Sequence, residues 1–257
     1  MQGEEQDDAP QPYLRGFELN ATCFEETRGL SGATLQRWAE VVTPHLQQWG
    51  GPVLEVGAGT GRFTRPLARC GIELIPLDRS RGMILEGRRR GTTGYVRGDA
   101  AHLPFRDGAF RQAILAHFLH LVPDPLSVVR EVRRVTQKGV VAISFEPQGA
   151  APWTRYLELL ANEQGKETPF PGMPERDLAS LVRPDQEVEL LVVHDHRHAD
   201  QMMRWMEDHS YSFTWSVPAA VHRTLMTRLR EEGFATRPLP PSLVRLHRWS
   251  AATLERV

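Results

Sequence analysis

Short apolar segments alternate with amphipathic ones through residues 52–146. The short segments have the length and apolar content of buried strands. The longer segments place apolar residues three and four positions apart, which is the spacing of one helix face. Strands that alternate with helices usually pair in parallel, and each helix crosses one face of the sheet. The pattern therefore predicts an α/β fold.

The same reading gives the strand positions. Strands are predicted at 52–56, 72–77, 93–98, 111–117, 139–145, 187–193 and 243–249. Their order predicts a reversal of strand order between the first and the fourth strand, the place where ligands bind in such sheets. We expect a doubly wound, mostly parallel sheet of seven strands with helices on both faces.

Helical spacing precedes the first strand and recurs after the fourth. The apolar stripe that would cover the first strand is Leu35, Trp38, Ala39, Val42 and Leu46. Pro44 lies inside this stripe and is expected to kink or end the helix. Further helices are predicted over 126–135, 201–206 and 218–229.

Prolines concentrate between the fifth and sixth strands, and a short helical pattern at Trp153, Leu157 and Leu160 lies among them. We interpret this region as an inserted lid. The acidic residues 1–12 are expected to be disordered. The predicted organisation is one domain over 13–257, with a core at 52–146, the lid at 147–185 and a C-terminal sheet edge with helices at 186–257.

Three glycines at alternate positions follow the first strand, in the run VLEVGAGTG at 53–61. Glycine can adopt positive φ and lets a ligand lie against bare backbone. Strand–turn–helix junctions of this kind hold nucleotide-like cofactors. A dinucleotide fingerprint would need glycine where Arg62 stands, and the Gly-Lys-Ser/Thr of a P-loop is absent.

The remaining pattern, E-x-G-x-G-x-G, resembles the first motif of the class I S-adenosylmethionine (SAM) methyltransferases. Three further features follow in the family's order: Asp78 at the end of the second strand, G-D-A-x-x-L-P-F at 98–105, and the loop 117–125 after the fourth strand. The resemblance implies a Rossmann-like enzyme that transfers a methyl group from SAM.

The resemblance also implies roles for individual residues. The glycine loop and Glu55 would hold the methionine end of SAM, Asp78 its ribose, and Asp99 its adenine. Met83 could pack on the adenine or fill the core, Asp78 could instead cap a helix, and Asp99 could serve only a turn. The expected cofactor contacts are Arg28, Glu55, Gly57, Ala58, Gly59, Gly61, Asp78, Arg79, Met83, Asp99, Ala100 and His117.

Residues 23–30 resemble a Tyr-Asp-x-x-Arg-Gly segment that closes over SAM in many small-molecule methyltransferases. Phe24 stands where the tyrosine is usual, so a hydroxyl contact is lost. Arg28 could reach the SAM carboxylate or only a helix end.

His117 and His120 are the candidates for a general base, because they follow the fourth strand at the edge of the expected methyl-transfer site. They would share one face if the chain were helical there. Histidines at this point could instead pack against the cofactor. A base is needed mainly when the acceptor is a hydroxyl, a carbon acid or a protonated amine.

The acceptor is expected to be a small molecule, apolar or planar, because aromatic residues are frequent in the lid and C-terminal region: Trp153, Phe170, Tyr211, Phe213 and Trp215. Each could also be a core residue. The alternatives are an RNA or protein methyltransferase and an inactive SAM-binding sensor or scaffold. A net charge of −1 argues against RNA, although Arg223, Arg228 and Arg230 could form a local basic patch.

Other features exclude further classes. His194, His196 and His198 would share one face of a strand, but a solvated strand end is the favoured interpretation, and no metal is expected. Cys23 and Cys70 suggest no disulfide framework. The N-terminus lacks a signal-peptide pattern, and no apolar stretch reaches the ~20 residues of a membrane span. We expect a cytoplasmic protein with no membrane or nucleic-acid partner.

Overall fold

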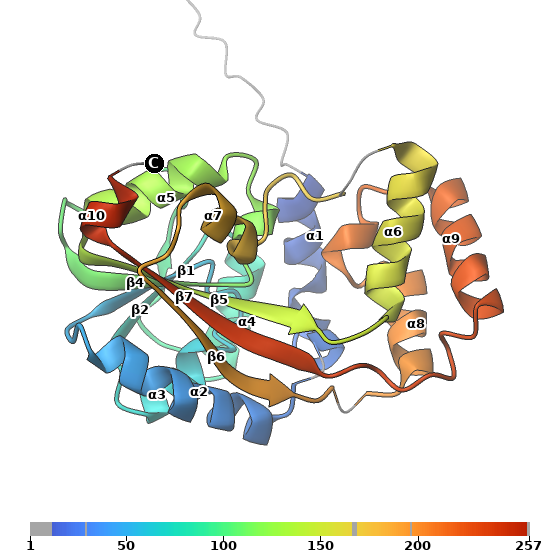
Figure 1. Cartoon of the computed structure of the whole chain (residues 1–257), viewed down its shortest axis with the longest axis horizontal. Helices are drawn as coiled ribbons and strands as arrows, with labels where there is room; N and C mark the ends of the chain where they lie inside the picture. Colours follow the sequence, from blue (N-terminus) through green and yellow to red (C-terminus); the bar gives the residue numbers. More distant parts are fainter. Residues whose placement is uncertain (1–11, 29, 166–168, 196, 256–257) are drawn as a thin grey trace, which may run out of the picture.

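The computed structural model describes residues 12–28, 30–165, 169–195 and 197–255. Its centre is a seven-stranded sheet of order β3-β2-β1-β4-β5-β7-β6 (Figure 1). The strands are β1 (Val53–Val56), β2 (Leu74–Asp78), β3 (Val96–Arg97), β4 (Phe110–Ala116), β5 (Thr136–Pro147), β6 (Gln186–Val193) and β7 (Ser242–Ser250). All the predicted strands are confirmed.

The strands β1 to β5 pair in parallel, whereas β7 runs antiparallel between β5 and β6. The order reverses between β1 and β4, as predicted, so the carboxyl ends of these two strands open onto one crevice. The doubly wound, mostly parallel fold is thereby confirmed.

Helices cover both faces of the sheet, because successive residues of a strand point to opposite faces. On one face Leu54 and Val56 pack with residues of α5 (Pro125–Val135), α7 (Glu175–Leu181) and α10 (Ala251–Leu254). On the other face Val53 packs with residues of α2 (Gly32–Gln47) and α3 (Thr64–Arg69). The helix α4 (Arg81–Arg89) follows β2.

The helix α2 continues past Pro44, so the expectation that this residue could end it is wrong. Val42 and Leu46, on either side of Pro44, are both buried in the core. The amide of Gln112 donates to the carbonyl of Leu46 at 2.6 Å, which satisfies one of the free carbonyls of the last turn. Core packing therefore holds the last turn despite the missing N–H.

A second group of helices lies beside the sheet (Figure 1). The helices α6 (Pro152–Gln164), α8 (Ala199–Glu207) and α9 (Ala219–Glu231) share an apolar cluster of their own. We call these three helices, with residues 208–218, the helical cap. The predicted helices at 201–206 and 218–229 correspond to α8 and α9. The proline-rich region 147–185 is divided between two places, because α6 joins the cap whereas α7 packs against the sheet.

The helix α1 (Pro12–Asn20) lies between the sheet and the helical cap (Figure 1). It contacts α4 on one side and the 3₁₀ turn η4 (Ser212–Thr214) on the other. The predicted disorder of 1–12 concerns residues that lie outside the described part of the chain, except Pro12, which begins α1. No described helix has the length and apolar content needed to cross a membrane.

Candidate active site

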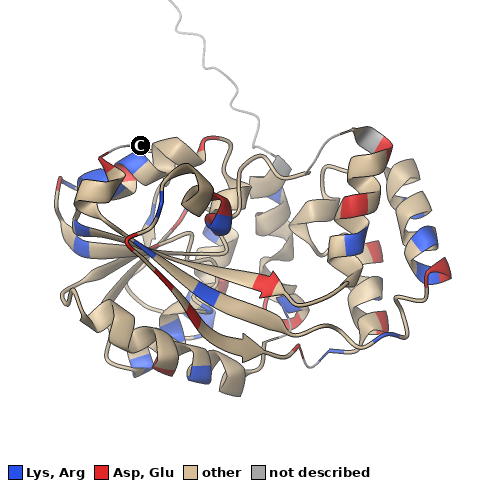
Figure 2. Ribbon diagram, viewed as in Figure 1, with Lys and Arg blue, Asp and Glu red and all other residues tan. Residues whose placement is uncertain are grey.

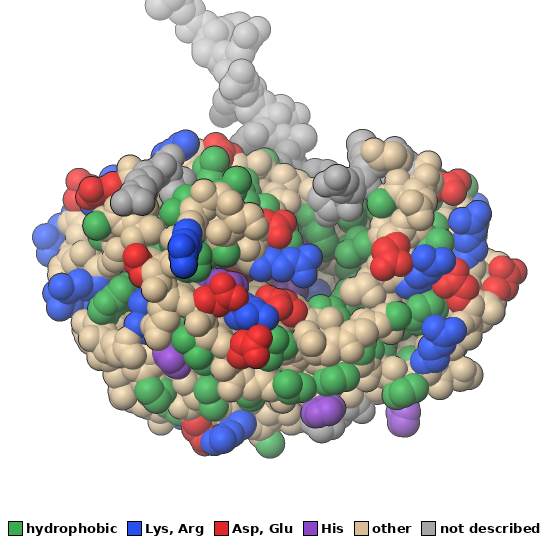
Figure 3. All heavy atoms as spheres, viewed as in Figure 1, with side chains coloured by type: hydrophobic (Ala, Val, Ile, Leu, Met, Phe, Trp, Pro, Cys, Tyr) green, Lys and Arg blue, Asp and Glu red, His purple; other side chains and the backbone are tan. Residues whose placement is uncertain are grey.

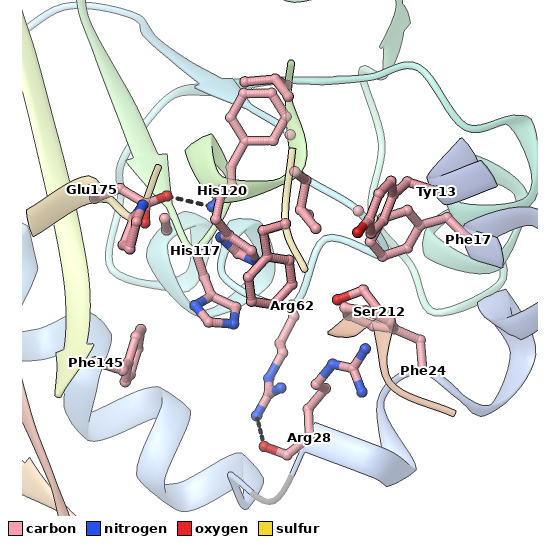
Figure 4. Close-up of a pocket in the computed structure, with 18 of the residues that line it drawn as sticks. Tyr13, Phe17, Phe24, Arg28, Arg62, His117, His120, Phe145, Glu175 and Ser212 are labelled. Atoms are coloured by element: carbon pink, nitrogen blue, oxygen red, sulfur yellow. Dashed lines mark hydrogen bonds between the residues drawn. The ribbon is translucent and has the colours of Figure 1, made fainter. Parts of the chain in front are cut away.

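A cavity of about 670 Å³ opens at the carboxyl ends of β1 and β4 and extends beneath the helical cap. Its floor is the glycine loop that follows β1, and its walls include α1 and the loop after β4. Figure 4 shows side chains from these separate elements pointing into the same space. A cavity of this size lies in the range of small-molecule sites.

The glycine loop needs its glycines for different reasons. Gly57, Gly59 and Gly61 have φ of +72°, +57° and +72°, which other residues adopt only with strain. Gly57 and Gly59 line the cavity together with Ala58. Gly61 does not line it, and a β-carbon there would lie 2.1 Å from the hydroxyl oxygen of Thr92. Gly61 is thus required for packing behind the loop.

Asp78 lies beside the loop and lines the cavity. The backbone N–H groups of Gly59 and Ser80 donate to its two oxygens at 2.7 and 2.8 Å. Burial raises the pKa of Asp78 to about 6, against the opposing effect of these N–H groups. The helix-capping role that Asp78 could have had belongs to Ser80, whose hydroxyl accepts the N–H of Met83.

The far end of the cavity holds the other predicted adenine contacts. Met83 and Ala100 are buried and line the wall. Asp99 accepts the N–H of Ala101 at 2.9 Å, so it closes a turn and also faces the cavity. Arg79 lies 3.6 Å from the Asp99 carboxylate, and both side chains are partly exposed. The two interpretations of Asp99 are compatible.

Glu55 is not on the cavity wall. It lies beneath the loop, 2% exposed, and accepts the hydroxyl hydrogen of Thr64 at 2.5 Å. Burial raises its pKa to about 7, and the nearby Asp78 carboxylate adds to the shift. Among the predicted cofactor contacts, Glu55 and Gly61 are therefore the two that the structure places outside the lining.

Two arginines form a cationic wall. Arg28 ends the 3₁₀ turn η2 (Glu26–Arg28), and its guanidinium lies 4.3 Å from the ring centre of Phe24 and 4.9 Å from that of Tyr211. Arg62 donates to the carbonyl of Arg28 at 3.0 Å (Figure 4). Burial lowers the pKa of each to about 10. Both arginines nevertheless remain charged at pH 7.

Arg62 lines the cavity but was not among the predicted site residues. In the sequence, Arg62 is notable only because it stands where a dinucleotide fingerprint needs glycine. That arginine beside the glycine loop was the one sequence feature that could have indicated its place in the site. Glu25 was also missed. Its carboxylate accepts from the Thr60 hydroxyl at 2.7 Å and from Arg65 at 2.5 Å, so it ties the segment before β1 to the glycine loop.

The two histidines lie together, with ring centres 4.7 Å apart (Figure 4). The cause is not a shared helix face. His117 has φ of +58° and turns the chain sharply after β4, and His120 lies in the 3₁₀ turn η3 (Leu119–Leu121). His120 also packs edge-on against the ring of Phe170 at 4.7 Å.

His117 is open to water in the cavity but enclosed by the surrounding protein. This enclosure, and then the charges of Arg28 and Arg62, lower its pKa to about 4. Water in the cavity weakens the first effect, but both arginines act in the same direction, so the pKa stays below its ordinary value. Burial, then His117 and Arg28, lower the pKa of the 6% exposed His120 well below 6.5. Both imidazoles are neutral at pH 7.

Comparison with known proteins identifies the family. Residues 54–144 match the methyltransferase domain family. A demethylmenaquinone methyltransferase from Renibacterium salmoninarum is 35% identical over 160 residues, which cover 60% of this chain and 68% of that protein. The chain belongs to the class I SAM-dependent methyltransferases. It is therefore an enzyme of the kind that the sequence motifs predicted.

Two further similarities define how far this conclusion reaches. A demethylmenaquinone methyltransferase from Paenarthrobacter aurescens is 35% identical over 112 residues. The matched segment covers 43% of this methyltransferase and 44% of the length of that protein, which is less than half of either. The solved structure of a putative methyltransferase from an antibiotic biosynthesis pathway of Anabaena variabilis covers 86% of this chain and 98% of its own, with a TM-score of 0.59 and 15% identity. That likeness concerns the fold alone.

SAM is the methyl donor of this family, and the cavity of this methyltransferase suits it. Gly57 and Gly59 line the cavity and have no side chains, so the loop leaves bare backbone facing it. A carboxylate at Asp78 and a cation at Arg28 face the same space. These groups match the hydroxyls and the carboxylate of SAM.

The remaining predicted residues are divided between the cavity and other places. The aromatic residues Trp153, Phe170, Tyr211 and Phe213 line the cavity, whereas Trp215 packs edge-on against Phe17 at 4.9 Å. His194 follows the end of β6, His198 precedes α8, and His196 lies outside the described residues. Within the described ranges, no three His, Cys, Asp or Glu side chains are grouped to hold a metal ion.

Proposed function

We propose that this methyltransferase transfers the methyl group of SAM to a small-molecule acceptor bound in the same cavity. The observation that carries this proposal is the continuity of the cavity. It runs from the glycine loop, past His117, to aromatic side chains of the helical cap such as Trp153 and Phe213. One continuous space could thus hold a cofactor and an acceptor in contact.

The cofactor would be held by residues from several elements. Gly57, Ala58 and Gly59 would lie under its amino-acid end, and Arg28 would pair with its carboxylate. Asp78 would accept the ribose hydroxyls. Arg79, Met83, Asp99 and Ala100 would surround the adenine. The predicted contribution of Glu55 and Gly61 would then be indirect, through the conformation of the loop.

The acceptor would lie between the histidines and the helical cap. Phe145, Trp153 and Phe170 line this part of the cavity, and flat aromatic walls favour a planar or apolar molecule. The curated relatives are named for demethylmenaquinone. A reduced, short-chain demethylmenaquinone analogue is therefore the first acceptor to test.

The chain's own residues would contribute alignment and charge. SAM, when bound, supplies a methyl group on a sulfonium that needs no further activation. The cavity walls would align the acceptor with that group, which alone provides a large rate advantage. Neutral His117 or His120 could accept a proton from a hydroxyl or carbon acid. Arg62 would stabilise the resulting negative charge on the acceptor, and the helical cap would exclude water.

Calorimetry followed by a transfer assay tests this proposal. SAM and S-adenosylhomocysteine should bind with micromolar affinity, whereas NAD should not bind. Labelled SAM should then methylate the reduced quinone analogue. Absence of SAM binding would overturn the cofactor site. Binding with transfer only to tRNA or to a protein would overturn the small-molecule acceptor.

A nucleic-acid substrate receives little support from the surface. Arg230, one of the three arginines suggested as a basic patch on α9, lies 2.6 Å from Glu207. Basic and acidic side chains are mixed along the ribbon (Figure 2) and over the face in Figure 3. An extended basic surface is the usual footprint of RNA binding. We therefore propose the small-molecule acceptor.

A further inference from the structure

Glu175, in the first turn of α7, reaches the loop that follows β4. One oxygen of its carboxylate, Oε1, accepts the backbone N–H of Phe118 and the backbone N–H of Leu119, the latter at 3.0 Å. Figure 4 draws one of these two bonds at Glu175. Glu175 is only 2% exposed. Among the described residues, no Lys or Arg lies within ion-pairing distance of it. A buried carboxylate without a cation is costly, so its two N–H partners are what stabilise it there.

A second contact holds the same loop from the same segment. The backbone N–H of Gly172 donates to the carbonyl of His120 at 3.1 Å. A β-carbon at Gly172 would lie 2.3 Å from the carbonyl oxygens of both Leu119 and Val122. Residues 172–175 therefore hydrogen-bond to or pack against the backbone of the loop at several peptide groups from Phe118 to Val122.

This loop carries two side chains that line the cavity where methyl transfer is proposed, His117 and Phe118. His117, in its left-handed conformation, precedes the first held N–H group. Phe118 places its ring against Gly57, where a β-carbon would be 2.1 Å from the ring. A shift of the loop backbone would therefore move both the His117 imidazole and the Phe118 ring that packs against Gly57.

We propose that Glu175 is a positioning residue for methyl transfer. It fixes the backbone after β4 so that His117 faces the cavity and Phe118 packs on Gly57. The assignment rests on the proposed function, because it takes this part of the cavity as the place where cofactor and acceptor meet. Under this assignment, the second half of the proline-rich region 147–185 positions the loop after β4.

The test compares Glu175→Ala with Glu175→Gln. Because one oxygen accepts both N–H groups, glutamine can keep both hydrogen bonds, whereas alanine keeps neither. Leu178→Ala is the matched control, since Leu178 is 1% exposed in the same helix and lies in the core. The readouts are the imidazole pKa values of His117 and His120, measured by NMR titration, and calorimetry with S-adenosylhomocysteine.

In Glu175→Ala we expect at least one imidazole pKa to rise by about one unit or more toward 6.5, because the released loop admits water. The dissociation constant of S-adenosylhomocysteine should rise about fivefold or more, whereas Glu175→Gln should stay within about twofold of the wild type. Leu178→Ala should lower the melting temperature without moving either titration. This difference separates positioning from a general loss of stability.

Three results would overturn the assignment: unchanged titrations and affinity in a folded Glu175→Ala, a Glu175→Gln variant as impaired as alanine, or equal shifts in Leu178→Ala. If Glu175→Ala does not fold, Gly172→Ala disturbs the same loop and is judged by the same readouts. The titrations need neither acceptor nor cofactor. Failure of the wild type to bind S-adenosylhomocysteine would count against the proposed function and would leave the titrations to decide on Glu175.

Discussion

The ring of Phe118 lies against Gly57, so closely that a β-carbon added to the glycine would be 2.1 Å from the ring carbon Cδ2. The two residues belong to the loops after β4 and β1, which meet where the strand order reverses. This contact joins the predicted cofactor loop to the segment that carries the two histidines. It makes Gly57 sensitive to substitution for two reasons, its positive φ and its neighbour.

Gly57→Ala should weaken binding of S-adenosylhomocysteine by about tenfold or more, because the new methyl group displaces Phe118. Gly71→Ala is the control. Its φ of +83° carries similar strain, but no atom lies within 4 Å of the added carbon. Calorimetry on both variants measures the effect. If Gly57→Ala bound S-adenosylhomocysteine with wild-type affinity, the proposed binding of the cofactor against the glycine loop would be contradicted.

Asp78→Asn should weaken S-adenosylhomocysteine binding by about tenfold to a hundredfold, because an amide nitrogen cannot accept a hydrogen bond. The wild-type affinity should also depend on pH. The pKa of Asp78 is raised to about 6, so the accepting carboxylate is fully present about one pH unit above that value and is lost as the pH falls through 6. Affinity should therefore be constant above about pH 7 and decline as the pH falls through 6.

The control for that experiment is Asp208→Asn, at an exposed position. It should keep both the affinity and its pH dependence. Asp78→Asn should show a flat profile between pH 5 and 7. A wild-type profile that is equally flat would argue against a ribose contact at Asp78.

Glu55→Gln should stabilise the protein at alkaline pH. The folded-state pKa of Glu55, about 7, lies above its ordinary value of 4.5, so its contribution to stability is full below pH 4.5 and is lost as the pH rises through 7. Glutamine mimics the protonated carboxyl. Chemical denaturation should show a gain on the order of 3 kcal/mol at pH 8 and little change near pH 4.5.

Glu73→Gln, at an exposed position before β2, is the control and should change stability little at either pH. If Glu55→Gln gave the same change in unfolding free energy at both pH values, the buried carboxyl would not have the raised pKa.

Arg28→Met should distinguish the two ends of the cofactor. If Arg28 pairs with the carboxylate, the variant should bind S-adenosylhomocysteine about tenfold or more weakly, because a charge-assisted pair is lost. Its affinity for 5′-methylthioadenosine, which lacks the amino-acid end, should be unchanged. Methionine keeps an apolar contact with Phe24 and Tyr211. Equal losses for both ligands would mean that Arg28 acts only by holding the segment before β1.

Much of the fold and of the cofactor loop follows from the sequence. Residues 53–61 contain a strand pattern, an acid and three glycines whose positive φ values the structure bears out. Such features depend on neighbours in the chain, since period, backbone freedom and capping act over a few residues. The strand positions and the place of Asp78 at the end of β2 were predictable for that reason. The reversal between β1 and β4 was predictable from the alternation of strands with helices along the chain.

The tertiary structure decided the contacts that join distant segments. Arg62 donates to Arg28 across 34 positions, and Glu175 accepts from Phe118 across 57. In both hydrogen bonds one of the two groups is a backbone carbonyl or N–H. Every residue has a backbone carbonyl and nearly every residue a backbone N–H, so the sequence does not indicate which one is the partner. The helix α2 passes Pro44 because the core holds both of its sides. The left-handed turn at His117 brings the two imidazoles together. Local periodicity thus determines which elements form, whereas their packing determines which charges and rings face the same cavity.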